Sequence, residues 1–333
     1  MLIKNAIILL LLLNLVGCGG GGGGVQPTIY PVVSLSTSHA SVAENSVTTV
    51  TLTVTASKIS DEDITVTLST SGTATDGTDY SAVNGSSLTI TAGTTTAIKT
   101  FTITDNSIYE GNETVIVAIS TVSGGSATEN GTQTETITIT ENESAPVITL
   151  ATSHTTVAEN SGITITLTAT SSQVADEDVV VTLASSGTAT NGTDYSSLGG
   201  QTITISAGLT TGTITGTPTD DSIYEDDEVA AIAISTVSGG GATESGTQSV
   251  SITITENESA PTVTLATSTS SVTENSGTTV TLTATASQAA DEDITVTLST
   301  SGTATNGTDY SAINTQTITI AAGSTTGTKS FTP

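Results

Sequence analysis

Three prolines, Pro31, Pro146 and Pro261, recur at intervals of 115 residues and begin three copies of one sequence. The motifs Asp61-Glu62-Asp63 and Gly77-Thr78-Asp79-Tyr80 recur at the same interval, without insertions. Each complete copy has the length of an ordinary domain, so it can close a hydrophobic core of its own. The repeat therefore predicts a row of independent domains, unlike a solenoid, whose turns need their neighbours.

Within a copy, apolar residues alternate with threonine, as in Val50-Thr51-Leu52-Thr53-Val54. Alternation of β-branched residues between turns rich in Gly, Asn and Ser is typical of half-buried strands. In the first copy the pattern predicts seven strands, at about 33–35 with an extension, 48–56, 64–70, 87–92, 97–104, 114–121 and 132–140. Seven short strands in a domain of this length indicate an all-β fold, an antiparallel β-sandwich.

The N-terminal residues predict export and lipid attachment. Lys4 precedes an apolar run, residues 6–16, which is short for a bilayer span and typical of a signal peptide. The run ends at Leu15-Val16-Gly17-Cys18, which resembles the lipobox of bacterial lipoproteins. The resemblance implies that residues 1–17 are a cleaved signal peptide and that Cys18 is acylated. The alternative is an ordinary signal peptide with a chance cysteine, but Cys18 is the only cysteine in the chain.

Residues 18–31 are expected to form a tether between the lipid and the first domain. They contain a run of six glycines, Gly19 to Gly24, and glycine-rich chains behave as flexible coil. Gly19 stands where an inner-membrane retention signal would place Asp, which favours the outer membrane. We therefore expect a lipid-anchored protein of the cell envelope, at the outer membrane or the cell surface, with the membrane as one partner.

The charge of the chain excludes some partners and suggests others. It has 32 acidic residues against four Lys, a formal net charge of −28. Nucleic acid is excluded because phosphate binding needs Lys and Arg. High negative charge also strains a compact state by self-repulsion, which divalent cations relieve. The alternative is that the acidity serves solubility alone.

The acids of one copy fall on particular connections. If the strands run up and down in turn, four connections lie at the same end of the sandwich: the first link, the third, the fifth and the exit from the last strand. In the first copy these connections carry the oxygen-bearing residues Glu44, Asp79, Asp105, Asn106, Glu110, Glu113, Glu141 and Glu143. Carboxylate and amide oxygens without His or Cys suit Ca²⁺, which takes about 6–8 oxygen ligands, and Mg²⁺ is the second choice.

Three stretches of the first copy resemble the Calx-beta domain. They are Glu44-Asn45, the segment from Gly72 to Tyr80 (GTATDGTDY), and Asp105 with the following Ile108-Tyr109-Glu110-Gly111-Asn112-Glu113. The Calx-beta domain is an immunoglobulin-like sandwich found in sodium–calcium exchangers, integrin β4 and bacterial surface proteins. The resemblance covers nearly everything from Pro31 onward and implies repeats at 32–146, 147–261 and 262–333.

The resemblance also implies calcium ligands. In repeat 1 they would be Glu44, Asp79, Asp105, Glu110, Glu113, Glu141 and Glu143, and in repeat 2 Glu159, Asp194, Asp220, Asp221, Glu225, Glu228, Glu256 and Glu258. Asn106 stands where repeat 2 has Asp221, so repeat 1 is expected to bind more weakly. Both repeats also exit through Glu-Asn-Glu, where calcium-sensing members carry a run of Asp.

The third repeat is expected to be incomplete. Pro333 aligns with Ile103 and Pro218, so residues 262–333 lack counterparts of the last two strands and of the acidic loop before them. Glu274 and Asp309 remain, and two ligands are too few for a calcium site of this type. We expect this repeat to be part of a longer array.

The cluster Asp61-Glu62-Asp63 lies on the link between the second and third strands, at the pole opposite the proposed site. We interpret it as a solvated turn. The alternative is that its copy in repeat 2, residues 176–178, approaches the calcium pole of repeat 1.

An enzyme is not predicted. No Ser–His–Asp spacing is present, and a glycosidase carboxylate pair would lack an aromatic platform, because the chain has no Trp and only two Phe. The prediction is a calcium-dependent structural or adhesive array on the cell surface, with a cell-surface or matrix partner. The alternative is a passive stalk that needs no metal, or a fragment of a larger surface protein.

Overall fold

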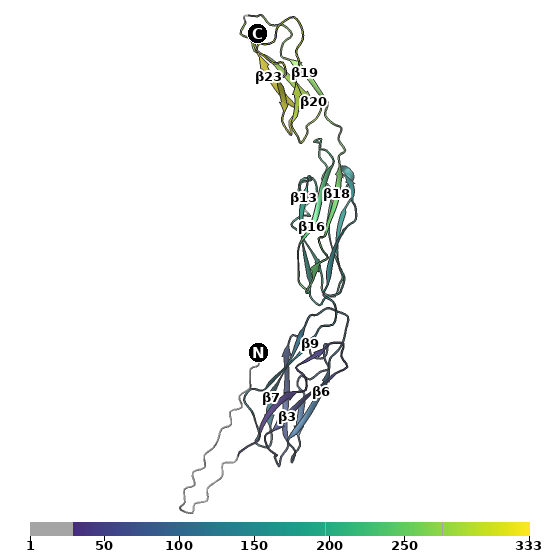
Figure 1. Ribbon diagram of the computed structural model, residues 1–333, viewed down its shortest axis with the longest axis vertical. Coiled ribbons are helices and arrows are strands. Elements are labelled where there is room, and N and C mark those ends of the chain that lie inside the picture. Colours follow the sequence, from purple (N-terminus) through teal and green to yellow (C-terminus); the bar gives the residue numbers. More distant parts are fainter. Residues whose placement is uncertain (1–28, 197, 275) are drawn as a thin grey trace, which may run out of the picture.

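The computed structural model describes residues 29–196, 198–274 and 276–333. Three β-sandwich units follow one another along an elongated chain (Figure 1). The predicted signal peptide, Cys18 and most of the predicted tether lie outside the described residues. Among the residues that are described, no helix is long and apolar enough to cross a membrane.

Repeat 1 is a sandwich of two sheets. One sheet has the order β6-β3-β1-β8, formed by β6 (Thr96–Thr102), β3 (Thr49–Ala56), β1 (Val32–Thr37) and β8 (Thr128–Glu129). The other has the order β2-β9-β7-β4-β5, formed by β2 (Ser41–Ala43), β9 (Thr134–Thr140), β7 (Glu113–Ser123), β4 (Ile64–Gly72) and β5 (Ser87–Ile90). Along β3, Val50, Leu52 and Val54 are fully buried, whereas the threonines between them lie on the outer face. The predicted alternation therefore builds the core.

The seven predicted strands of repeat 1 are confirmed, and the first of them is divided between the two sheets. Its first part, β1, pairs antiparallel with β3, and its extension, β2, pairs parallel with β9. The short β8 also pairs parallel with β1. These two parallel pairs are exceptions to the antiparallel pattern. Strand β2 continues the direction of β1 but lies in the other sheet, where its neighbour β9 runs the same way.

Repeat 2 reproduces this sandwich with a core of its own. Its sheets have the orders β15-β12-β10-β17 and β11-β18-β16-β13-β14. The strands are β10 (Val147–Thr152), β11 (Thr156–Ala158), β12 (Ile165–Ser171), β13 (Val179–Gly187), β14 (Thr202–Ile205), β15 (Thr211–Gly216), β16 (Glu228–Ser238), β17 (Thr243–Glu244) and β18 (Ser249–Thr255). A single 3-10 turn, Glu159–Ser161, follows β11. The cores of repeats 1 and 2 are separate clusters, as expected for independent domains.

Repeat 3 has fewer strands than repeats 1 and 2 among the described residues. Strands β19 (Val263–Thr267), β20 (Val280–Ala286) and β23 (Thr326–Phe331) form one sheet, and β21 (Ile294–Thr297) pairs with β22 (Thr317–Ile320). No strand of the described residues takes the place that β7 and β9 have in repeat 1. Leu265 is consequently 53% exposed, whereas its counterpart Leu35 in repeat 1 is 6% exposed.

Candidate metal centre

Four connections of repeat 1 bring their acids to one pole of the sandwich. Glu44 follows β2, Asp79 lies between β4 and β5, Glu110 precedes β7, and Glu141 follows β9. Across the described residues of repeats 1 and 2, four groups of three carboxylates have ligand oxygens within 4.8 Å of one another. The groups are Glu44, Glu141 and Glu143; Asp79, Glu110 and Glu113; Glu159, Glu256 and Glu258; and Asp194, Glu225 and Glu228. We call the first and third the exit clusters and the second and fourth the loop clusters.

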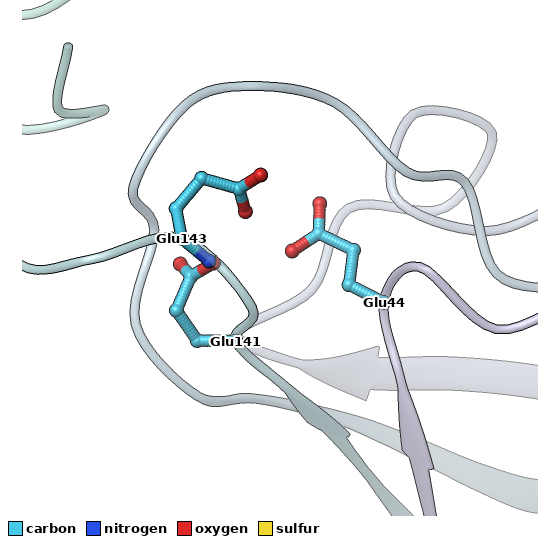
Figure 2. A group of neighbouring side chains, drawn as sticks. All are labelled: Glu44, Glu141 and Glu143. Carbon is cyan, nitrogen blue, oxygen red and sulfur yellow. The ribbon is translucent and has the colours of Figure 1, made fainter. Parts of the chain in front are cut away.

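In the exit cluster of repeat 1, three carboxylates turn toward one another (Figure 2). Glu44 is buried, with 4% of its surface exposed. The carboxylate of Glu141 accepts hydrogen bonds from the backbone amides of Glu110 at 2.6 Å, Gly111 at 2.8 Å and Glu143 at 2.9 Å. The Oε2 atom of Glu143 is buried and accepts no hydrogen bond. Backbone amides thus fix the position of Glu141, and the buried oxygen of Glu143 remains without a donor inside the cluster.

The loop cluster of repeat 1 is built around a buried aspartate. Asp79 is 8% exposed, and its Oδ2 accepts a hydrogen bond from the backbone amide of Thr75 at 2.6 Å. Glu110 Oε2 accepts a hydrogen bond from the side-chain amide of Asn106 at 3.2 Å. Glu113, the first residue of β7, completes the group. Two of the three carboxylates therefore have their positions fixed by loop donors.

Repeat 2 has an exit cluster and a loop cluster at the corresponding positions. Glu256 accepts a hydrogen bond from the backbone amide of Glu225, as Glu141 does from Glu110. Glu159 Oε1 accepts one from the backbone amide of Asp221 at 3.1 Å. The Oε2 atoms of Glu228 and Glu258 are buried and have no hydrogen-bond partner.

Four of the predicted ligands lie outside the carboxylate groups: Asp105, Asn106, Asp220 and Asp221. Asn106 and Asp221 accept hydrogen bonds from the backbone amides two residues later, at 2.6 Å and 2.7 Å, which turns them toward their own loop. Asp105 and Asp220 still lie close to the exit clusters. The neighbouring carboxylate of Glu141 and burial raise the pKa of Glu143, and the charge of Asp105 adds to this rise. Burial raises the pKa of Glu159, and Asp220 contributes in the same direction.

Like charges and burial together perturb the clustered carboxyls. Burial and the charges of Glu141 and Glu110 raise the pKa of Glu44 to about 7. Burial and Asp79 raise the pKa of Glu113 to about 7, and burial with Asp194 raises that of Glu228 to about 8. Carboxyl groups with such values resist ionisation unless a cation joins them.

The pKa values of Glu141 and Glu256 shift in the opposite direction. Burial alone would raise the pKa of Glu141, but hydrogen bonds from the backbone amides of Glu143 and Glu110 outweigh it, and the pKa is lowered. The pKa of Glu256 is lowered by the corresponding bonds, against the same effect of burial. These two carboxylates remain charged and anchor their clusters.

The donor set fits a hard divalent cation. The four clusters contain carboxylates only, and buried oxygens without partners remain at Glu143, Glu228 and Glu258. Calcium takes oxygen ligands in flexible geometry and in large number, whereas magnesium demands a nearly ideal octahedron. In repeat 3, Asp309 accepts a hydrogen bond from Thr305 as Asp79 does from Thr75, but within the described residues it belongs to no such cluster.

Asp176 is exposed, as expected for a turn, but its backbone also contacts the acidic pole of repeat 1, which is the alternative given above for residues 176–178. Its backbone amide donates to the carbonyl of Tyr109 in repeat 1 at 3.2 Å. Burial and Asp79 raise the pKa of Glu110, and the charge of Asp176 adds to the rise. The contact lies between two repeats, so no pattern within one repeat reveals it.

Comparison with known proteins identifies the family. The Calx-beta domain model matches residues 27–143, 141–258 and 256–326. The structure of CBD12 from CALX1.2 is 15% identical, with 67% of this chain and 99% of that chain covered and a TM-score of 0.31. The apo-form Calx CBD1 domain is 22% identical, with 34% and 99% covered and a TM-score of 0.29. The adhesin InvE of Yersinia pseudotuberculosis is 14% identical, with 71% and 61% covered and a TM-score of 0.32.

No curated protein sequence matches the chain. The family model accounts for all three repeats and for nearly all of the described residues. The chain belongs to the Calx-beta domain family.

Proposed function

We propose that this chain is a calcium-binding, lipid-anchored array of the cell surface with a structural or adhesive role. The observation that carries the proposal is the set of four carboxylate clusters at the loop poles of repeats 1 and 2. Each cluster gathers three acids, and three of the four contain a buried oxygen that accepts no hydrogen bond. Calcium would supply the missing partner of these oxygens and offset the repulsion between the carboxylates.

The exit clusters connect metal binding to the mechanics of the array. Glu141 and Glu143 lie on the short segment between β9 of repeat 1 and β10 of repeat 2. An ion bound between them and Glu44 would fasten this segment to the start of repeat 1. A chain of domains joined in this way is stiffer than one joined by a free linker, and stiffness suits a molecule that extends from a membrane.

The membrane partner of the proposal is the lipid on Cys18. Two or more acyl chains hold a protein firmly, whereas one chain holds it only marginally. The outer membrane or cell surface is the proposed location, and a cell-surface or matrix molecule is the proposed partner of an adhesive array. The proposal assigns the chain binding and structural roles and no catalysis.

A passive stalk is the second candidate function. Two observations favour it: repeats 1 and 2 each close a separate core, and backbone hydrogen bonds join the two repeats. Under this alternative the acids would serve solubility, and calcium would change neither the stability nor the shape of the chain.

Calorimetric titration of the chain with calcium distinguishes the calcium-binding array from the passive stalk. The proposal predicts saturable heats, and a variant with Glu44→Gln and Glu159→Gln should lose the exit-site part of them. Titration with magnesium serves as the control for general charge screening. An absence of saturable heats in millimolar calcium would leave the passive stalk.

A further inference from the structure

Exposed apolar side chains gather at one end of repeat 1. Ile29, Tyr30 and Ile59 are each more than half exposed, and with Lys58 they line a cavity of about 610 Å³. The cavity lies between the start of β1 and the link from β3 to β4, at the end of repeat 1 that points away from repeat 2 (Figure 1). We call this surface the tether pole. Apolar side chains exposed together mark an interaction site, whereas scattered ones do not.

Repeats 2 and 3 differ from repeat 1 at the tether pole and agree with each other. At the places of Ile29, Tyr30 and Lys58, both repeats have Ser, Ala and Gln. These residues are Ser144, Ala145 and Gln173 in repeat 2 and Ser259, Ala260 and Gln288 in repeat 3. Repeat 1 therefore carries larger apolar side chains and a cation where its copies have small or neutral ones. The difference indicates a role of this pole that the copies do not share.

In repeat 2 the corresponding surface is covered by repeat 1. The backbone amide of Tyr109 donates to the carbonyl of Val174, the counterpart of Ile59, at 2.9 Å. The side-chain amide of Gln173 donates to the carbonyl of Ser107 at 2.7 Å. At the tether pole, by contrast, the described lining of the cavity comes from repeat 1 and the three residues before it. The same surface thus serves as a contact between domains in repeat 2 and is open in repeat 1.

The tether pole is not shaped for the loop that covers repeat 2. A Cβ atom built on Gly241 would lie 2.5 Å from Cε1 of Tyr109, so the ring of Tyr109 needs a glycine there. Repeat 1 has Ser126 at that place. The backbone is left-handed at both residues, with φ of 49° at Ser126 and 59° at Gly241, so the Cβ of Ser126 fills the space that the ring would take. A second Calx-beta domain is therefore a poor fit for this surface.

The sequence places the predicted lipid close to the tether pole. Residues 19–28 alone separate Cys18 from Ile29. A glycine-rich segment of about ten residues has an end-to-end distance of about 16–19 Å. Acylation of Cys18 would hold the tether pole within this distance of the bilayer. Such a link raises the effective concentration of the two surfaces, so even a weak contact between them is populated.

The side chains of the tether pole suit the boundary between lipid and water. Tyrosine rings lie at the level of the lipid headgroups, and isoleucine gains by leaving water for the acyl region. The aliphatic part of Lys58 can lie along this apolar surface while its ammonium group meets a lipid phosphate. Asp61 and Glu62 line the same cavity, and the formal net charge of the chain is −28. An anionic surface would repel these charges, so a membrane without net charge is the better match.

We propose that the tether pole rests on the lipid surface that holds Cys18, so that the array stands upright on the membrane. This inference rests on the proposed lipid anchor and goes further, because it gives the protein a second contact with the membrane and an orientation. A domain held by a glycine-rich tether alone is free to tilt and rotate. A contact through the far end of repeat 1 directs repeats 2 and 3 away from the surface.

The test introduces a single Trp into the full chain, which has none of its own. The lipidated variants Ile59→Trp and Leu209→Trp are reconstituted separately into phosphatidylcholine vesicles that contain brominated lipid. Leu209 is more than half exposed but lies in repeat 2, so it serves as the control position. The emission of Ile59→Trp should shift to the blue and be quenched by the brominated lipid. Leu209→Trp should show neither effect.

A third protein tests the side chains themselves. It combines Ile59→Trp with Ile29→Ser, Tyr30→Ala and Lys58→Gln, which gives repeat 1 the residues of repeats 2 and 3. These residues are tolerated in two copies of the same fold, and an unchanged thermal midpoint in solution would establish that the variant folds. The proposal predicts that it loses the quenching seen with Ile59→Trp alone.

The outcomes distinguish this inference from the proposed function. Labelling with a fatty acid reports lipid attachment separately, and a chain without label would refute both the lipid anchor and the membrane contact. If the chain is labelled but Ile59→Trp is quenched no more than Leu209→Trp, the lipid anchor stands and the membrane contact is overturned. Equal quenching of the third protein and Ile59→Trp would overturn it too. End-to-end dimers in small-angle scattering, without quenching, would assign the tether pole to a second copy of the chain.

Discussion

The carboxylate of Glu141 accepts a hydrogen bond from the backbone amide of Glu110 at 2.6 Å, which ties the exit of the last strand to the acidic loop. A second bond, from Gly111 at 2.8 Å, strengthens the tie. The exit cluster and the loop cluster of repeat 1 therefore both depend on the side chain of Glu141. Glu256 plays the same part in repeat 2 through the amide of Glu225.

Replacing Glu141 with alanine should destabilise repeat 1 even without metal. Hydrogen bonds to a charged group contribute about 1.5–3 kcal/mol each, and the loss leaves two loop amides without their acceptor. Urea unfolding in chelator measures the effect. Glu62→Ala, on the exposed link at the other pole, is the control and should change the free energy of unfolding by less than about 0.5 kcal/mol. Equal effects of the two substitutions would contradict the structural role of Glu141.

The metal-free chain should lose stability as the pH rises from about 4.5 to 7. Glu44 and Glu113 have pKa values of about 7 in the folded state, raised by burial and by neighbouring acids from an ordinary value of 4.5. In that window the unfolded chain releases protons that the folded chain retains, so unfolding is favoured as the pH increases. Thermal midpoints in chelator at pH 5, 6, 7 and 8 measure the slope. Glu44→Gln should flatten it, and a midpoint that rises steadily through this range would refute the effect.

Asn106 and Asp221 should account for a difference in affinity between repeats 1 and 2. Asn106 donates its side-chain amide to Glu110 and so occupies one of the carboxylate oxygens that calcium would use. Asn106→Asp removes this donor and adds a charge, so it should strengthen calcium binding by repeat 1 and lower its stability in chelator. Asp221→Asn should weaken binding by repeat 2. Calorimetric titration of both variants measures the calcium affinities. Unchanged affinities in both variants would show that these two residues do not set the difference between the repeats.

Cys18→Ser should abolish lipid attachment. The thiol of Cys18 is the acylation site implied by the lipobox, and no other cysteine in the chain can replace it. Metabolic labelling with a fatty acid measures the attachment, and Asn14→Ser, in the apolar run, is a control that should be labelled as wild type is. Equal labelling of Cys18→Ser and the wild-type chain would rule out the lipoprotein interpretation.

The strands could be predicted from the sequence because burial and alternation coincide. Val50, Leu52 and Val54 are buried and the threonines between them face outward, so a period of two identifies both strand and core. The division of the first strand into β1 and β2 could not be predicted in this way. It depends on which sheet each half meets, and that is a property of the assembled sandwich.

The pole that carries the acids could also be predicted, since it follows from the up-and-down order of the strands. The division of these acids into an exit cluster and a loop cluster could not be predicted. Glu44 and Asp79 belong to different clusters although both lie at the same pole, because their side chains meet different loops. Asn106 and Asp221 were predicted as ligands from their place in the motif, but their side chains bond to their own loops. The approach of Asp176 depends on a contact between domains, which no pattern within one repeat reveals.

The thermal midpoint of the whole chain, measured with and without calcium, shows whether the folded chain binds calcium at its carboxylate clusters. Calcium that binds only the folded state adds about 2.7 kcal/mol at a hundredfold excess over its Kd, a rise on the order of 10 °C for a domain of this size. A variant with Glu44, Glu113, Glu159 and Glu228 replaced by Gln should show no rise. In chelator it should be at least as stable as the wild type, which establishes that it folds. A wild-type midpoint that stays unchanged in millimolar calcium would show that the clusters bind no calcium and would favour the passive stalk.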